Sequence, residues 1–239
     1  MTGEQGRKAA IFGASGGIGA ALAEGLADRG GTVLAGSRSG HVVPGTIPFT
    51  FDFDREDSIA VAVAEWRDEP PELVITATGA LTLPDGTGPE LSFKAIDAAA
   101  MARIFHLNTV GPAMIARCVL PLLPRDRRSV FAALSARVGS IGDNRLGGWH
   151  SYRASKAALN MLLRNFAIEM RRTHPHAVIA GLHPGTVDTA LSGPFQSGVP
   201  QGQLQTPAES ARHLIAVVER LQAEDSGGVF DWRGDRLPD

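Results

Sequence analysis

The chain of 239 residues contains a single cysteine, a single tyrosine and no apolar run as long as a membrane span. One cysteine excludes an internal disulfide and fits a reducing compartment. That residue, Cys118, lies in an apolar helical pattern, so we interpret it as a small core residue rather than a nucleophile. A spanning helix needs about 18 or more apolar residues, and the amino-terminal segment has no long apolar region. We therefore expect a cytoplasmic protein that does not bind membranes.

The chain also lacks an excess of charge of either sign. Its formal net charge is −2, and acidic and basic residues are mixed along it. No basic patch predicts nucleic acid or an anionic membrane as a partner. A hydrophobic content of 44% is sufficient for a sizeable core, and the length suits one domain over residues 1–239. We predict no metal site.

Short apolar runs alternate with longer amphipathic ones along the whole chain. Continuous apolar strands separated by helices are typical of a parallel sheet covered on both faces. The sequence therefore predicts the α/β class, as a single doubly wound, Rossmann-type sheet. We expect strands within residues 8–15, 32–38, 47–54, 72–80, 129–136 and 177–185, and helices within 18–30, 57–69, 97–123, 151–173 and 206–222.

Three local features refine this prediction. Asp57 or Ser58 is expected to cap the second helix, and Thr206, followed by Pro207, the last one. The long helix over 97–123 could bend near Pro112. The Gly/Pro-rich stretch at about 190–206 is short enough to be a mobile loop inside the domain.

A glycine-rich turn, "GASGGIG" at Gly13–Gly19, follows the first predicted strand and opens the first helix. Glycines there allow a tight turn and bring backbone N–H groups against a pyrophosphate at the helix N-terminus. In this position the turn predicts a nucleotide site, although a tight turn without a ligand is the alternative.

Several further motifs follow in order: "DFD" at the end of the third strand, "LNTVGP" with Asn108, "YRASK" with Tyr152 and Lys156, and "HPGTVDT" after the sixth strand. Together with the spacing of Gly13, Gly17 and Gly19, they resemble the short-chain dehydrogenase/reductase family over almost the whole chain. The stretch "LSARVGSIGDNRLGGW" is most similar to the C-factor or sniffer-type carbonyl reductases. This resemblance implies a nicotinamide cofactor, a small carbonyl or alcohol substrate, and a homodimer or homotetramer.

The resemblance also implies which residues bind the cofactor. Where NAD-preferring members have an acid after the second strand, this chain has Ser37, followed by Arg38. A guanidinium suits a 2′-phosphate, so NADP(H) is expected over NAD(H); the alternative is that Arg38 is only a solvated charge. The implied cofactor-binding residues are Gly13, Ser15, Gly17, Ile18, Gly19, Ser37, Arg38, Asp52, Phe53, Gly79, Asn108, Tyr152, Lys156, Pro184, Gly185, Val187 and Thr189.

Tyr152 and Lys156 are four residues apart, which places them on one face of a helix. A free phenol titrates near about 10, so acid/base work at neutral pH requires a shift of roughly 3 units, or about 4 kcal/mol. One ammonium at about 4 Å, at an effective dielectric of about 20, supplies about 4 kcal/mol. We interpret the pair as the acid/base centre; the alternative is a half-buried aromatic beside a surface charge. By resemblance, Lys156 also holds the nicotinamide ribose, and Asn108 bends its helix to hold a water.

The family's third catalytic group, a serine at the end of the fifth strand, is missing, because Ala136 occupies its position. Ser135 would point to the opposite side of the strand, whereas Ser140 could reach the site from the loop, so Ser140 is slightly favoured. The functional hypothesis is an NADP(H)-dependent oxidoreductase that moves hydride between nicotinamide and a ketone, aldehyde or secondary alcohol. Because of Ala136, a nucleotide-binding sensor with little turnover is the alternative.

Overall fold

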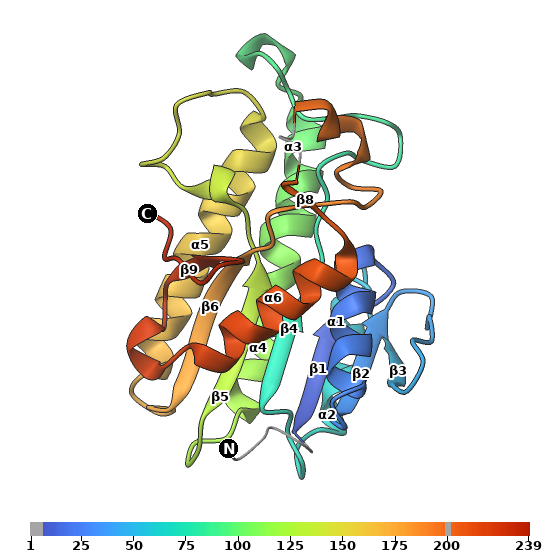
Figure 1. Cartoon of the computed structure of the whole chain (residues 1–239), viewed down its shortest axis with the longest axis vertical. Helices are drawn as coiled ribbons and strands as arrows, with labels where there is room; N and C mark the ends of the chain where they lie inside the picture. The colour runs from blue at the N-terminus through green and yellow to red at the C-terminus, as the bar shows by residue number, and fades with distance from the viewer. Residues whose placement is uncertain (1–6, 199–201) are drawn as a thin grey trace.

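The computed structural model describes residues 7–198 and 202–239, and a parallel sheet forms its centre (Figure 1). Seven strands are hydrogen-bonded in the order β3-β2-β1-β4-β5-β6-β9. The predicted doubly wound α/β fold is confirmed. The strands are β1 (Lys8–Phe12), β2 (Thr32–Ser37), β3 (Ile47–Thr50), β4 (Leu73–Thr76), β5 (Ser129–Leu134), β6 (Ala177–His183) and β9 (Val229–Asp231).

Helices cover both faces of this sheet, as the continuous apolar strands require. The helices α1 (Gly17–Ala27) and α6 (Pro207–Arg220) pack together on one face (Figure 1). The opposite face carries α2 (Glu56–Ala64), α4 (Gly111–Val119) and α5 (His150–Met170). The helix α3 (Ala98–Phe105) precedes α4, and the short strands β7 (Thr186–Val187) and β8 (Leu204–Gln205) form a separate pair.

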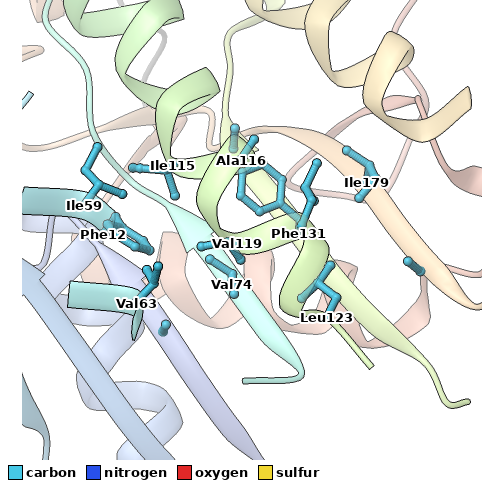
Figure 2. Close-up of a cluster of buried hydrophobic side chains, with 14 of the residues drawn as sticks. Phe12, Ile59, Val63, Val74, Ile115, Ala116, Val119, Leu123, Phe131 and Ile179 are labelled. Atoms are coloured by element: carbon cyan, nitrogen blue, oxygen red, sulfur yellow. The ribbon is translucent and has the colours of Figure 1, made fainter. Parts of the chain in front are cut away.

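The core on the α2/α4/α5 face shows why these segments adopt this arrangement (Figure 2). Phe12 and Phe131 project from the strands and have no exposed surface. Ile59 of α2 and Ile115 of α4 close over them and are equally buried. Burying a side chain of this size contributes about 1.5 to 3 kcal/mol. The helices are therefore held by their apolar faces.

The predicted cap of the second helix is wrong, whereas that of the last helix is confirmed. The helix α2 begins at Glu56 with Arg55 at its N-cap. The Ser58 hydroxyl instead accepts a hydrogen bond from the Asp52 N–H at 2.8 Å, which fixes the turn after β3. Thr206 caps α6 in a reciprocal arrangement with Glu209.

The predicted helix over 97–123 is interrupted at Asn108. A π-helical turn over His106–Val110 separates α3 from α4, and the Gly111 N–H donates to the His106 carbonyl five residues back. A 3-10 turn, Leu120–Leu122, ends the segment. Single π turns inside α-helices often occur at functional sites. In this turn the Asn108 side chain lies at the carboxyl end of β4, where it hydrogen-bonds to the Ala80 backbone.

The strand order reverses at β1, which pairs with β2 on one side and β4 on the other. In open parallel sheets, the crevice at the carboxyl ends of two such strands is where ligands bind. The glycine turn follows β1, and the segment Ala77–Gly79 follows β4. The fold therefore brings these two segments to the predicted nucleotide site.

Candidate active site

The glycine turn forms a cradle that side chains would fill. Gly13 has φ +96°, and a Cβ there would lie 3.0 Å from the Ala77 carbonyl carbon. A Cβ on Gly19 would overlap the Gly13 carbonyl oxygen, and one on Gly17 would lie 2.8 Å from the Thr189 methyl group. The N-cap of α1, Gly16, has no side chain to cap the first turn. This arrangement fits a pyrophosphate, because backbone N–H groups at a helix N-terminus attract anions.

The predicted adenine end of the site lies at the carboxyl ends of β2 and β3. Ser37 is buried, and its hydroxyl accepts the His41 N–H at 2.8 Å, so it shapes the loop after β2. Arg38 is exposed beside it. Asp52 is partly buried, and the Phe53 ring packs over Gly111 of α4, where a Cβ would overlap it. A cationic, open edge fits a charged ribose substituent.

Asn108 ties the π turn to the segment after β4. Its side chain is fully buried, with Oδ1 accepting the Ala80 N–H at 2.7 Å and Nδ2 donating to the Ala80 carbonyl at 2.9 Å. Nδ2 also donates to the Ser155 hydroxyl at 3.1 Å. Ser155 in turn donates to the Tyr152 carbonyl at 2.8 Å. A chain of hydrogen bonds thus runs from the strand end through Asn108 to the helix turn that carries Tyr152.

Lys156 is buried between α5 and the strand ends. Its Nζ donates to the Leu134 carbonyl at 2.7 Å and lies 5.9 Å from the centre of the Tyr152 ring. A Cβ on Gly79 would lie 3.4 Å from this Nζ and 3.1 Å from Asn108 Oδ1, so a side chain at residue 79 would crowd both groups. Four of the implied site residues, Gly79, Asn108, Tyr152 and Lys156, are therefore neighbours in the fold.

The electrostatics of the pair differ from the expectation. Burial raises the pKa of Tyr152 to about 12 and lowers the pKa of Lys156 to about 8. The Lys156 ammonium donates to the Leu134 carbonyl, and its Nζ lies 5.9 Å from the centre of the Tyr152 ring. In this structure burial shifts the pKa of Tyr152 away from neutrality, opposite to the shift that acid/base work at neutral pH requires. An acidic phenol requires further positive charge, which an oxidised nicotinamide ring carries.

The two serines proposed for the missing hydroxyl are hydrogen-bonded elsewhere. The Ser135 hydroxyl donates to Oδ1 of Asn160, a residue of α5, at 2.6 Å. The Ser140 hydroxyl accepts the Asp143 N–H at 3.1 Å and donates to the Asp239 carbonyl at 3.4 Å. None of these hydrogen bonds joins either serine to Tyr152. Ala136, in the serine position, is buried.

The segment after β6 closes the other side of the site. Gly185 has φ +77°, and a Cβ there would overlap Gln205. The carbonyl of Pro184 accepts from Gln205 Nε2 at 3.2 Å, and Val187 pairs with Gln205 in the β7–β8 ladder. Thr189 then packs against Gly17. Ser15, exposed at the tip of the glycine turn, and Ile18, in the first turn of α1, complete the placement of the implied residues.

Trp149, an aromatic residue that the cofactor prediction did not include, lies between Tyr152 and Phe195. The Trp149 ring centre is 6.3 Å from that of Tyr152 and 5.1 Å from that of Phe195. Phe195 belongs to a 3-10 helix, Gly193–Gly198, within the predicted loop at 190–206. Residues 199–201 of that loop lie outside the described residues. The loop thus contacts the site through two edge-to-face ring contacts.

A cavity of about 420 Å³ has Tyr152 in its wall. It lies between α3, the segment after β4 and the start of α5. Glu90 and Ser151 are polar residues of the wall, and most of the rest is apolar. The pattern along the chain did not predict this cavity. Its apolar wall comes from the segment after β4 and from α3, and it encloses a space only where this stretch meets the start of α5; the apolar wall residues are Leu81, Leu83, Pro89, Leu91, Ala95, Ala100 and Ile104.

No group of three or more histidine, cysteine, aspartate or glutamate side chains within 7–198 and 202–239 could hold a metal ion. In the same part of the chain, no helix combines the length and the apolar character needed to cross a membrane.

A parallel sheet with a glycine turn at its switch point, and a half-buried tyrosine beside a buried lysine, are typical of nucleotide-binding oxidoreductases. A family model described as short chain dehydrogenase matches residues 7–199. The chain belongs to the short-chain dehydrogenase family, which confirms the resemblance.

Individual proteins agree with this assignment. C-signal of Myxococcus xanthus is 36% identical over 143 residues, which cover 60% of this chain and 81% of C-signal. Two solved structures share the fold. NADPH-bound carbonyl reductase from chicken fatty liver has a TM-score of 0.81 at 23% identity, covering 98% of this chain and 94% of that one. Carbonyl reductase Sniffer of D. melanogaster has a TM-score of 0.83 at 21% identity, covering 98% and 100%.

Proposed function

We propose that this protein is an NADP(H)-dependent oxidoreductase that transfers hydride between nicotinamide and a ketone, aldehyde or secondary alcohol. The observation that carries the proposal is the meeting of Asn108, Tyr152 and Lys156 beside the glycine cradle. When bound, the cofactor supplies or accepts the hydride. Tyr152 gives a proton to the carbonyl oxygen in reduction and removes it from the alcohol in oxidation.

Lys156 and Asn108 act on Tyr152 and on cofactor binding. The Lys156 ammonium, anchored on the Leu134 carbonyl, holds the nicotinamide ribose and adds positive charge near the phenol. Asn108 fixes the turn that carries Tyr152 through Ser155. Arg38 binds the 2′-phosphate of the cofactor, because it is exposed and no acid stands at Ser37 to repel that group. The 420 Å³ cavity takes the apolar part of an uncharged carbonyl compound.

The protein acts in the cytoplasm as a homodimer or homotetramer in this proposal. Exposed apolar side chains on the helices that carry Asn108 and Tyr152 support the pairing: Val110, Met161 and Ile168.

The test is turnover of NADPH with a panel of uncharged aromatic and aliphatic ketones and aldehydes. Tyr152→Phe keeps the ring and removes only the proton, so carbonyl reduction should drop at least about 100-fold while NADPH still binds. A Tyr152→Phe variant with near wild-type kcat would exclude the acid role.

A second candidate is a nucleotide-binding protein with little turnover. Ala136 favours it, since no hydroxyl stands in the serine position and both neighbouring serines are engaged elsewhere. Tight NADPH binding without turnover of any carbonyl in the panel would support this candidate.

A further inference from the structure

The helix α5, which carries Tyr152 and Lys156, begins without a cap of its own. Its N-cap residue, Trp149, has φ +50° and makes no side-chain capping bond. Gly147 and Gly148 before it also have positive φ, at 63° and 64°. The first N–H groups of a helix have no partner within the helix and require one from outside. Tyr152 lies in this first turn, so whatever satisfies the turn also sets where Tyr152 lies.

Glu90 supplies the missing partner from a distant segment. Its Oε2 accepts the Ser151 N–H at 3.1 Å, and its Oε1 accepts the Ser151 hydroxyl. The carbonyl oxygen of Glu90 accepts the Trp149 N–H at 2.5 Å. Glu90 is 9% exposed and lies in the segment between β4 and α3, so three contacts from one residue join this segment to α5.

The charge of Glu90 suits this position. Burial raises the pKa of the Glu90 carboxyl, but the hydrogen bonds that it accepts, led by the one from the Ser151 hydroxyl, and the nearby His150 together leave the pKa below its ordinary value. A carboxylate is also favoured at a helix N-terminus, where the helix dipole is positive. Glu90 is therefore ionised at neutral pH, and its hydrogen bonds to Ser151 are charge-assisted and stronger than neutral ones.

Tyr152 is thus held on both sides along the helix. Glu90 fixes the residue before it, Ser151, and the Ser155 hydroxyl bonds the Tyr152 carbonyl. Glu90 and Tyr152 also line the same 420 Å³ cavity. A shift of the first turn would move the phenol relative to a carbonyl in that cavity and relative to Lys156.

We propose that Glu90 is a positioning residue for Tyr152, which caps α5 from the segment after β4 and fixes the phenol at the cavity wall. The role rests on the proposed function, since it concerns the acid of that reaction. A displacement of about 1 Å can cost about 100-fold in rate. Glu90→Ala should lower kcat about 10- to 100-fold with little change in the dissociation constant of NADPH.

The conservative variant and a matched control separate positioning from a general loss of stability. Glu90→Gln retains an acceptor for the Ser151 N–H and a partner for its hydroxyl, so kcat should stay within about 3-fold of wild type. Ser226→Ala removes the hydroxyl that accepts the Ile179 N–H at 3.0 Å, a partly buried bond that joins β6 to the segment before β9. This control should lower Tm as Glu90→Ala does, but leave kcat unchanged below the unfolding range.

Hydrogen exchange gives a readout that does not depend on turnover. In Glu90→Ala, the amides of residues 151–156 should exchange faster, whereas Ser226→Ala should not affect them. Loss of kcat with faster exchange, both restored in Glu90→Gln, is the expected result. Unchanged kcat and exchange in Glu90→Ala, or a kcat loss that Ser226→Ala reproduces, would overturn the positioning role. If wild type turns over no carbonyl, the proposed function fails, and the exchange data alone still decide whether Glu90 holds the turn.

Discussion

The Ser135 hydroxyl donates to Asn160 Oδ1 at 2.6 Å, on the face of β5 that α5 covers. Side chains alternate along a strand, so the next residue, Ala136, points to the other side. The hydroxyl of Ser135 therefore stabilises the packing of α5 on the sheet. In the proposed function, the position expected to face a substrate carbonyl is that of Ala136, which carries only a methyl group.

The first prediction concerns this position. Ala136→Ser should raise kcat for carbonyl reduction by roughly 10-fold or more, because loss of one such donor elsewhere costs about 100- to 1,000-fold. Steady-state kinetics with one ketone from the panel measure it. Ser135→Ala and Ser140→Ala are the controls and should keep kcat within about 3-fold, since their hydroxyls bond to other groups. A large loss in either control would show that a serine moves into the site when substrate binds.

The second prediction concerns cofactor choice. Arg38→Ala should weaken NADPH binding by about 1.5 to 3 kcal/mol, the range for a hydrogen bond to a charged group, and barely change NADH binding. Titration calorimetry with both cofactors measures this. Arg172→Ala removes an equally exposed positive charge near the end of α5 and should change neither affinity. Equal dissociation constants of wild type for NADPH and NADH would contradict the preference.

The third prediction uses the pKa of Lys156, which burial lowers from 10.5 to about 8. Below pH 8 the lysine is protonated in both states, and its buried charge destabilises the folded state. Between about pH 8 and 10 the unfolded chain binds more protons at this group, so its contribution to the free energy of unfolding rises with pH. Lys156→Met should therefore be more stable than wild type at pH 7, by roughly 1 to 3 kcal/mol, and this difference should shrink towards pH 10.

Denaturant unfolding of the cofactor-free protein at pH 7, 8, 9 and 10 gives this difference. Measurements stop there because Tyr152, whose pKa is raised from 10.0 to about 12, lowers the stability of the folded state above that range. Lys94→Met, which removes an exposed lysine, is the control. A gap between wild type and Lys156→Met that stays constant with pH would show that Lys156 is not shifted.

The fourth prediction concerns the segment from 191 to 198. Its 3-10 helix reaches the site through Phe195 and Trp149, so ligands that order the site should stabilise it. Hydrogen exchange in residues 191–198 should slow when NADPH and a non-reacting substrate analogue are both bound. The second half of α6, residues 214–220, serves as the internal reference. Unchanged exchange in 191–198 at saturating ligand would count against a closing loop.

Most of the fold followed from the pattern of apolar runs, because strands buried on both faces are continuously apolar. The strand β9 was missed. It has three residues, Val229–Asp231, too few to show a period, and it becomes a strand because the edge of β6 offers it hydrogen-bond partners. The sequence also predicted one helix over 97–123 and not the π turn at Asn108 that interrupts it. This turn depends on the Ala80 backbone and Ser155, which the chain brings there only in the folded state.

The sequence by itself determined the features that depend on near neighbours. The glycine spacing of the first turn and the four-residue spacing of Tyr152 and Lys156 have the same local geometry wherever such a turn or helix forms. Only the tertiary structure decided the features that depend on distant partners: the direction of Ser135, the burial that shifts the pKa values of Tyr152 and Lys156, and the cap that Glu90 provides for α5. Burial and hydrogen bonding between such segments depend on which surfaces meet after folding. A pattern of residues along the chain does not specify which distant surfaces those are.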